Sequence, residues 1–270
     1  MTGGGGMLGR EVVRAAAEHE VVALTHADLD VTDRAAVERT ITDVGPDVVI
    51  NCAGFTDVDG AESHVEAATR LNGEAAGYLA AAAPAIVHPS TDYVFDGSKR
   101  TPYVESDPTG PRSAYGRSKL AGERAVATAN PRHFIVRTSW LFGAGGKNFV
   151  DTMLGLAAER DELKVVDDQV GCPTYAGHLA NALVGLAEGD RYGIHHLAGT
   201  GECSWFSFAG EIFRQAELDV SVVPCTTAEF QRPAPRPAFS VLGSERPDAI
   251  RLPSWHEGLA AYLAERAPAR

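Results

Sequence analysis

The sequence predicts an α/β protein built on a doubly wound parallel sheet. Short apolar runs alternate with helical segments through the first half of the chain. These runs also lack the strict apolar–polar alternation of a sheet with one face in water. Strands of this kind are buried on both faces, so helices are expected to cover both sides of the sheet. In such a fold, ligands bind at the carboxyl ends of the strands.

The expected elements follow in order along the chain. The helix at 33–44 opens on Thr32-Asp33, a pair whose side chains suit a helix amino terminus. Strands are expected at 20–24, 46–51, 85–88, 133–137 and 193–197, and helices at 10–19, 33–44, 61–83, 115–128, 149–160, 176–188 and 204–216.

The second half of the chain is less regular than the first, which predicts a second, smaller domain. We expect residues 1–142 with 161–197 to form a dinucleotide-binding domain. A smaller carboxyl-terminal substrate domain would comprise 143–160 with 198–270. The proline-rich, arginine-bearing stretch at 226–253 is typical of a segment that wraps a surface or lines a cleft.

Composition narrows the class of protein. The chain has 270 residues, of which 44% are hydrophobic, and this is ordinary for a globular protein. Its net charge of −12 argues against nucleic acid as a partner, because such proteins carry a basic surface. No apolar run approaches the ~20 residues of a membrane helix, and no signal peptide is recognisable. We therefore expect a cytoplasmic protein with no membrane partner and with reduced cysteines.

A glycine-rich stretch at the amino terminus predicts a dinucleotide site. Gly3, Gly6 and Gly9 form G-x-x-G-x-x-G and run directly into a helical pattern. Such glycines let the backbone approach a pyrophosphate at a helix amino terminus. A Rossmann-like fold has a strand before this loop, yet only Met1 and Thr2 precede Gly3. We expect that the central first strand is missing because the true start lies upstream; real loss of that strand is the alternative.

The segments that follow the expected strands at 20–24 and 46–51 indicate which cofactor is bound. The run at 24–26 ends without an acidic residue to hold a ribose 2′-hydroxyl, which favours NADPH, with NADH also possible. Asp30 and Val31 would flank the adenine, although helix capping is an equal alternative. The segment 51–54 would pass the nicotinamide ribose or form a simple turn.

Polar side chains with the chemistry of a carbonyl reductase gather in two segments. Tyr115 and Lys119 lie four positions apart on an expected helix and therefore share one face. A nearby ammonium would lower the Tyr pKa from its usual value of about 10 and help proton transfer. Thr91 or Ser90, at the end of the strand at 85–88, would hydrogen-bond the reacting carbonyl. Tyr115, Lys119 and the hydroxyl of Thr91 or Ser90 together predict a catalytic site.

These motifs resemble the extended short-chain dehydrogenase/reductases, and within them most closely the dTDP-4-dehydrorhamnose reductases. The resemblance covers most of the chain from Gly3 to about Leu242, and "STDYVFDG", "YGRSKLAGE" and "RTSW" are its specific parts. The other matching stretches are "GGGGMLGREV", "NCAGFTDVDGAE", "RTSWLFGAGGKNF", "DDQVGCPTYA", "GIHHLAG" and "RPAPRPAFSVL".

The resemblance implies a role for each matched residue. Thr91, Tyr115 and Lys119 would be the catalytic triad, with Tyr115 protonating the C4 oxygen of the sugar as NADPH delivers hydride to C4. Lys119 would also hold the nicotinamide ribose. The implied cofactor-binding residues are Gly3, Gly6, Met7, Leu8, Asp30, Val31, Cys52, Ala53, Gly54, Tyr115 and Lys119, and the implied substrate-binding residues are Thr56, Val58, Asp92, Trp140 and Arg236.

Two of these roles have plainer alternatives. Trp140, expected to stack on the sugar, could be a core aromatic, and Arg236, expected near the nucleotide diphosphate, could anchor a loop. No residue set predicts a metal site. His195 and His196 would point to opposite faces of a strand, and Asp167-Asp168 fits a solvated turn. Magnesium is possible by resemblance, without a sequence motif.

The preferred hypothesis is NADPH-dependent reduction of dTDP-4-dehydro-L-rhamnose to dTDP-L-rhamnose, by a monomer or homodimer. A related 4-ketoreductase acting on another nucleotide sugar is one alternative, and an epimerase or dehydratase that keeps NAD bound through its cycle is another. A non-catalytic binding role, like that of the regulatory subunit of methionine adenosyltransferase, is a third; the complete Thr91, Tyr115 and Lys119 set argues against it.

Overall fold

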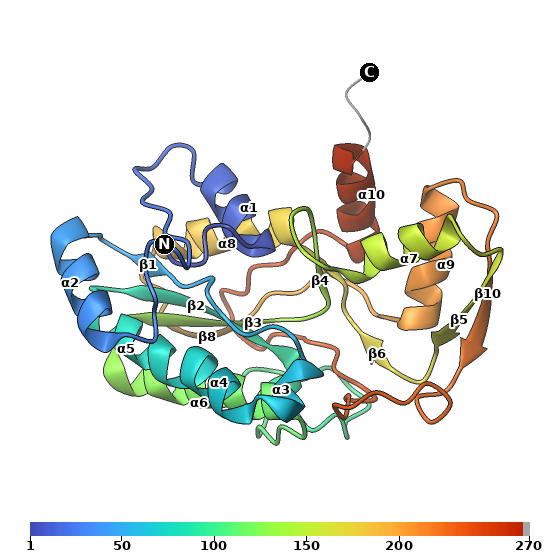
Figure 1. Cartoon of the computed structure of the whole chain (residues 1–270), viewed down its shortest axis with the longest axis horizontal. Coiled ribbons are helices and arrows are strands. Elements are labelled where there is room, and N and C mark those ends of the chain that lie inside the picture. The colour runs from blue at the N-terminus through green and yellow to red at the C-terminus, as the bar shows by residue number, and fades with distance from the viewer. Residues whose placement is uncertain (267–270) are drawn as a thin grey trace.

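A computed structural model describes residues 1–266 of the chain and confirms the doubly wound α/β fold. Four parallel strands form the main sheet in the order β1-β2-β3-β8. Helices cover both of its faces, and a second lobe lies to one side (Figure 1). The strands are β1 (Val49–Ile50), β2 (Ile86–Thr91), β3 (His133–Thr138) and β8 (Gly193–His196).

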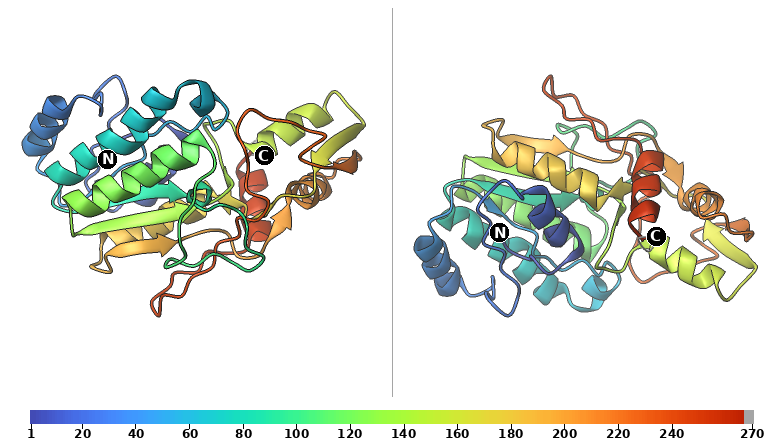
Figure 2. Two further views of the ribbon diagram at one scale, coloured as in Figure 1. Left: turned by 90° about the horizontal axis from the view of Figure 1, so that it is seen from below. Right: turned by 90° about the horizontal axis from the view of Figure 1, so that it is seen from above.

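The two layers of helices follow from the period of two along each strand. Val87 and Phe134 face a core with α1 and α8, whereas the adjacent Ile86 and Ile135 face a core with α2, α5 and α6. Figure 2 shows these layers from either side. The helices are α1 (Met7–Ala15), α2 (Arg34–Val44), α5 (Ala75–Ala82), α6 (Ala114–Ala129) and α8 (Ala176–Ala187).

The amino terminus lies next to β1, near one edge of the sheet. Thr2 bridges Leu24 on one side and Asn51 on the other, both in parallel. Its N–H donates to the Ile50 carbonyl at 3.1 Å, and its own carbonyl accepts from the Cys52 N–H at 3.1 Å. The position of a first strand is therefore present as isolated bridges. Of the strand expected at 20–24, only the bridge at Leu24 forms, because only Met1 and Thr2 lie opposite it.

The long helix expected at 61–83 is wrong as a single element. It divides into α3 (Gly60–Ser63), α4 (Val65–Thr69), the π-helical turn η1 (Arg70–Glu74) and α5. Within the π turn, the Asn72 side chain accepts from the Phe55 N–H at 2.8 Å and donates to Ser118 on α6 at 2.9 Å. These bonds tie the turn to the loop after β1 and to α6.

The second lobe has its own core, formed where three helices pack on a two-stranded parallel sheet. Its strands β5 (Glu162–Val166) and β10 (Ser221–Cys225) were not expected, nor was α10 (Trp255–Arg266). The other helices are α7 (Phe149–Ala157) and α9 (Trp205–Gln215), and short strands lie at β4 (Leu141–Phe142), β6 (Val170–Gly171), β7 (Thr174–Tyr175) and β9 (Cys203–Ser204).

The division into two domains stays a prediction. Within 161–197, expected in the dinucleotide-binding domain, β8 belongs to the main sheet and α8 packs on it, whereas Leu163 and Val165 of β5 lie in the core of the second lobe. Residues 267–270 of the expected substrate domain lie outside the described residues.

The glycine-rich loop generates a test of packing. A Cβ on Gly9 would lie 2.1 Å from the carbonyl oxygen of Gly3, whereas a Cβ on Gly5 would meet only the Thr25 methyl at 3.6 Å. We expect Gly9→Ala to lower the free energy of unfolding by about 1–3 kcal/mol through overpacking. Gly5→Ala is the control and should change it by less than about 0.5 kcal/mol. Urea unfolding measures both, and equal stabilities would contradict this account of the loop.

Candidate active site

The structure brings Thr91, Tyr115 and Lys119 together at the carboxyl edge of the main sheet. Thr91 is the last residue of β2, and the other two lie in the first two turns of α6. The Ser113 hydroxyl caps this helix by accepting from the Gly116 N–H at 3.1 Å. A Cβ on Gly116 would lie 2.3 Å from the Tyr93 carbonyl, so glycine allows α6 to begin directly beside the end of β2.

The phenol of Tyr115 is uncharged in this environment. Burial raises the pKa of its phenol to about 12, and a hydrogen bond with the Thr91 side chain lowers it by less than burial raises it. The expectation that Lys119 lowers this pKa is wrong. The Lys119 Nζ instead donates to the Pro89 carbonyl at 2.7 Å. The phenol is therefore protonated at neutral pH.

Lys119 carries the opposite perturbation. Burial lowers the pKa of its ammonium to about 8, while the charges of Glu123 and Cys52 oppose that shift. Only 8% of the residue is exposed. With a pKa of about 8, most of the Lys119 population is a buried cation near neutral pH.

The predicted cofactor residues converge at the start of α1. Gly3 has a φ of +69°, and a Cβ there would lie 2.5 Å from the backbone of Cys52 and Ala53. The loop therefore lies directly against the segment 51–54. Gly6 precedes α1 without a side-chain cap, and the first turn has no acidic residue. The uncapped N–H groups of Met7 and Leu8 suit the pyrophosphate of a dinucleotide.

Two predicted cofactor residues have clear structural roles. The Asp30 carboxylate accepts from the backbone and hydroxyl of Thr32 at 2.9 and 2.8 Å, which stabilises a turn before α2. Val31 is 5% exposed and belongs to the core with α2 and α5. Their expected contact with adenine stays a prediction.

The predicted substrate residues lie on both lobes. Thr56 is exposed and Val58 half-buried in the segment before α3. Asp92 is 1% exposed, and burial raises the pKa of its carboxyl to about 6. Its Oδ1 accepts from the Thr91 hydroxyl at 3.0 Å, and its Oδ2 is buried without a partner among the described residues. Asp92 is thus tied directly to the Thr91 hydroxyl.

Trp140 packs against a second tryptophan. Its ring stacks on Trp205 with centroids 3.4 Å apart and planes 4° from parallel. A Cβ on Gly171 would meet the same indole at 2.5 Å. The backbone φ of Trp140 is +47°, a strained value for a non-glycine residue. Stacking of Trp140 on a sugar stays a prediction, and the observed stack belongs to the rim of the second core.

A cavity of about 790 Å³ in the second lobe adjoins Arg236. Phe149 and Trp205 form part of its wall. Its charged lining residues are Arg160, Lys164, Arg232 and Arg236, against the single carboxylate of Glu162. An excess of cations around an aromatic wall suits an anionic ligand with a flat ring.

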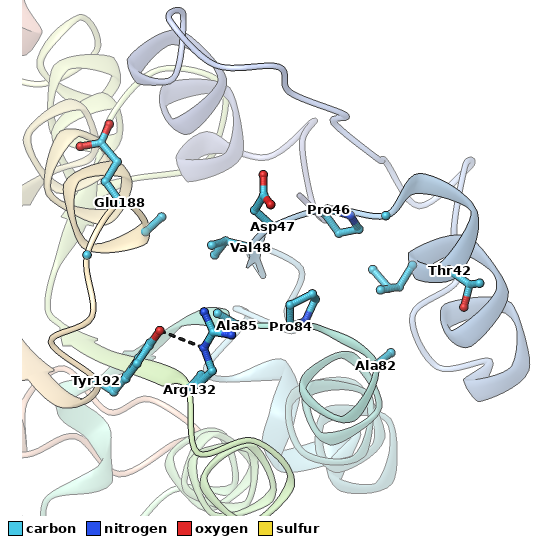
Figure 3. A pocket seen from close by; sticks show the side chains of 14 residues that line it. Thr42, Pro46, Asp47, Val48, Ala82, Pro84, Ala85, Arg132, Glu188 and Tyr192 are labelled. Atoms are coloured by element: carbon cyan, nitrogen blue, oxygen red, sulfur yellow. Dashed lines mark hydrogen bonds between the residues drawn. The ribbon is translucent and has the colours of Figure 1, made fainter.

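A second cavity of about 630 Å³ lies at the opposite, amino edge of the sheet (Figure 3). Asp47, Pro84 and Tyr192 are among the residues that line it, and Arg132 donates to the Tyr192 hydroxyl at 3.0 Å. No residue expected from the sequence to bind cofactor or substrate borders this cavity. The candidate site therefore lies at the carboxyl edge, away from this cavity.

Residues 1–266 contain neither a cluster of metal ligands nor a membrane-spanning helix. In that range no three His, Cys, Asp or Glu side chains gather closely enough to hold a metal ion. None of the helices there is long and apolar enough to cross a membrane. Magnesium binding stays without structural support.

Comparison with known proteins decides the family. The family model described as RmlD substrate binding domain matches residues 1–267. A probable dTDP-4,6-dihydroxy-2-methyloxan-3-one 4-ketoreductase of Streptomyces antibioticus is 48% identical, covering 91% of this chain and 86% of its own length. The crystal structure of a dTDP-4-dehydrorhamnose reductase from Clostridium acetobutylicum is 44% identical with a TM-score of 0.95, over 98% of this chain and 97% of that one.

The chain belongs to the dTDP-4-dehydrorhamnose reductase family. The enzyme of this name from Bacillus anthracis, solved in complex with NADP, is 38% identical with a TM-score of 0.95. That alignment covers 98% of this chain and 97% of the other.

Sequence reasoning missed a buried ion pair at the centre of this family's site. Glu123 and Arg137 are 4% and 3% exposed in their side chains. The Arg137 Nη2 and Nε donate to the Glu123 carboxylate at 2.8 and 3.0 Å, and the Ser90 hydroxyl donates to it at 2.5 Å. The two charged residues occupy the quoted motifs "YGRSKLAGE" and "RTSW". The signal that could have revealed this ion pair is a charged residue inside an otherwise apolar pattern.

Removal of one partner of this pair tests its structural role. Glu123→Gln leaves the buried Arg137 cation without its counter-charge, and we expect a loss of about 3–5 kcal/mol in the free energy of unfolding. The matched control is Glu38→Gln, which breaks the Arg34–Glu38 pair on the surface of α2. The control should cost at most about 1 kcal/mol. Urea denaturation of the two variants gives the comparison, and similar losses would contradict a central role for Glu123.

Proposed function

We propose that this chain is an NADPH-dependent reductase that converts dTDP-4-dehydro-L-rhamnose to dTDP-L-rhamnose. The observation that carries the proposal is the meeting of Thr91, Tyr115 and Lys119 beside the glycine-rich loop. Relatives with the name dTDP-4-dehydrorhamnose reductase support the substrate, and the NADP complex of one of them supports the cofactor.

Bound NADPH would supply the hydride to C4 of the sugar. Tyr115 gives its phenolic proton to the C4 oxygen, which a pKa of about 12 allows because the group is protonated at working pH. Thr91, hydrogen-bonded to Tyr115, orients the same oxygen. The Lys119 cation holds the nicotinamide ribose. The uncapped start of α1 holds the pyrophosphate.

The other half of the substrate belongs to the second lobe. The cationic lining of the 790 Å³ cavity suits the diphosphate, and its aromatic wall suits the thymine ring. Thr56 and Val58 would contact the sugar between the two lobes. Trp140 would contribute the edge of its indole, since Trp205 covers one of its faces. This arrangement would present the C4 carbonyl to Tyr115.

A second candidate is a 4-ketoreductase that acts on a different dTDP-linked keto sugar. The 48% identity to the probable 4-ketoreductase of Streptomyces antibioticus favours it. Both candidates share the chemistry at Tyr115 and differ only in the sugar. The ratio of kcat/KM for the two keto sugars separates them. An epimerase or dehydratase would retain its nicotinamide through the cycle, so net consumption of NADPH per product separates that class.

We place the reaction in the cytoplasm, where NADPH and nucleotide sugars occur together. The net charge of −12 fits a protein without a nucleic-acid partner. Monomer or homodimer is the expected state, which sedimentation velocity distinguishes.

Tyr115→Phe tests the proton donor. Loss of the hydroxyl removes a general acid, so we expect kcat to fall by about 10²- to 10⁴-fold while the Kd for NADPH changes by less than about twofold. Tyr192→Phe, which removes a hydroxyl at the remote cavity, should leave kcat unchanged. NADPH oxidation and fluorescence titration provide the two measurements. Full activity in Tyr115→Phe would remove the mechanism.

The charge of Lys119 predicts a pH dependence. Because burial places the pKa of this ammonium at about 8, kcat/KM should be highest below pH 8 and fall by about tenfold per pH unit above it. Tyr115 stays protonated across this range. Lys119→Arg keeps its charge and should lack the decline, although its activity is lower. A flat profile for the unmodified protein between pH 7 and 10 would refute the assignment.

Unfolding does not account for such a decline. The unfolded chain binds more protons at Lys119 than the folded one between about pH 8 and its ordinary value of 10.5. The contribution of this group to stability therefore rises with pH in that window. Thermal unfolding at each pH serves as the check.

A further inference from the structure

One carboxylate joins the two lobes beside the proposed substrate site. The Asp59 side chain accepts from Arg236 Nη1 and Nη2 at 2.9 and 3.0 Å in a bidentate pair. It also accepts from Arg232 Nε at 2.9 Å and from the Ala234 N–H at 3.1 Å. The partners lie more than 170 positions away in the sequence. One acidic group thus fixes three residues of the 232–236 segment.

Asp59 has no competing local role. It precedes α3, but its side chain does not cap that helix, and the Gly60 N–H donates to Asp57 instead. The side chains of Asp59 and Arg236 are 18% and 17% exposed, so the pair is largely withdrawn from water. The hydrogen bond from Arg236 is the main cause that holds the pKa of the Asp59 carboxyl well below its usual value. The carboxylate is charged at every working pH.

The segment that Asp59 holds faces the reaction site on one side and the cavity on the other. Arg232, Ala234, Pro235 and Arg236 line the 790 Å³ cavity. Arg236 also lies near Tyr93, whose ring packs edge-on against Tyr115 with centroids 5.6 Å apart. A displacement of this segment would therefore change the cavity mouth and the surroundings of the proton donor together.

The charges leave the segment able to bind an anion. Two guanidinium groups against one carboxylate leave a net single positive charge. Arg232 gives Nε and Nη2 to Asp59, and within residues 1–266 its Nη1 has no acceptor. A planar guanidinium fixed on one edge keeps its free donors in a defined direction, which lowers the entropy cost of receiving a phosphate.

We infer that Asp59 is a positioning residue that latches Arg232 and Arg236 across the mouth of the cavity so that they receive the diphosphate of the sugar nucleotide. This inference rests on the proposed function for the identity of the ligand. In this role Asp59 does not touch the reacting atoms. It acts through the two arginines and thereby determines the affinity for the nucleotide. A purely structural tie between lobes would instead affect all kinetic constants through stability.

The first experiment is Asp59→Asn, measured for both substrates. We expect the KM for the dTDP-keto sugar to rise about tenfold, while kcat and the KM for NADPH change by less than about twofold. The matched control is Asp248→Asn, because Asp248 accepts Nε and Nη2 of Arg246 at 3.0 Å in an equally bidentate pair away from the cavity. It should leave all three constants unchanged. A parallel fall of kcat in Asp59→Asn would overturn the latch.

A double-mutant cycle shows whether Asp59 acts through Arg236. If it does, Asp59→Asn combined with Arg236→Gln should raise the KM no more than about twofold beyond Arg236→Gln alone. If the KM of the double variant instead rises by the product of the two single-variant effects, the inference is overturned. A lower KM in Asp59→Asn would also overturn it, because the carboxylate would then be competing with the diphosphate for the arginines.

Binding of dTDP to the full chain separates this inference from the proposed function. Calorimetry should show about tenfold weaker dTDP binding in Asp59→Asn, with faster hydrogen exchange at the Ala234 amide. Unchanged affinity would overturn the latch. If the unmodified protein binds dTDP but does not reduce the dTDP-keto sugar, only the proposed function is overturned. A complete lack of dTDP binding by the unmodified protein would overturn both.

Discussion

The buried pair of Glu123 and Arg137 is the interaction on which the geometry of the site depends. It joins α6, which carries Tyr115 and Lys119, to β3, and through Ser90 it joins both to the end of β2. A buried ion pair contributes little net stability, since desolvation offsets most of the attraction. Its consequence is positional: the helix cannot slide along the sheet without leaving charges unpaired in the interior. The same carboxylate lies one turn beyond Lys119 and opposes the loss of that ammonium's proton.

From this fixed centre the site extends to the second lobe through polar contacts. The apolar cores of the sheet and of the second lobe are separate clusters, so each lobe is stabilised largely by its own packing. The segment at 232–236 crosses between them on hydrogen bonds to Asp59. Charged contacts across an interface depend on geometry, whereas apolar burial tolerates sliding. The proton donor and the cationic cavity can therefore hold a defined relative position without a shared core.

Much of the sheet, and the identity of the central residues, could be predicted from the sequence because their signals are local. The strand at 133–137 has an apolar centre of Phe134, Ile135 and Val136, and Tyr115 and Lys119 share a helix face through their spacing alone. The missed features depend on distant partners. The π turn in place of a continuous helix depends on Asn72 bonding to Phe55 and Ser118. Likewise β5 forms only because β10 pairs with it, and Asp59 finds its arginines more than 170 positions away. The Tyr115 pKa was misjudged because spacing shows a neighbouring charge but not burial.

That misjudgement bears on the direction of the chemistry. A phenol with a lowered pKa would be partly ionised before reaction and suited to accept a proton, as an alcohol oxidation needs. A phenol with a pKa of about 12 holds its proton until an alkoxide, which is more basic, develops at the reacting carbon. A buried tyrosine that keeps its proton thus fits the proposed reduction, since the driving force for proton transfer appears only as the hydride arrives.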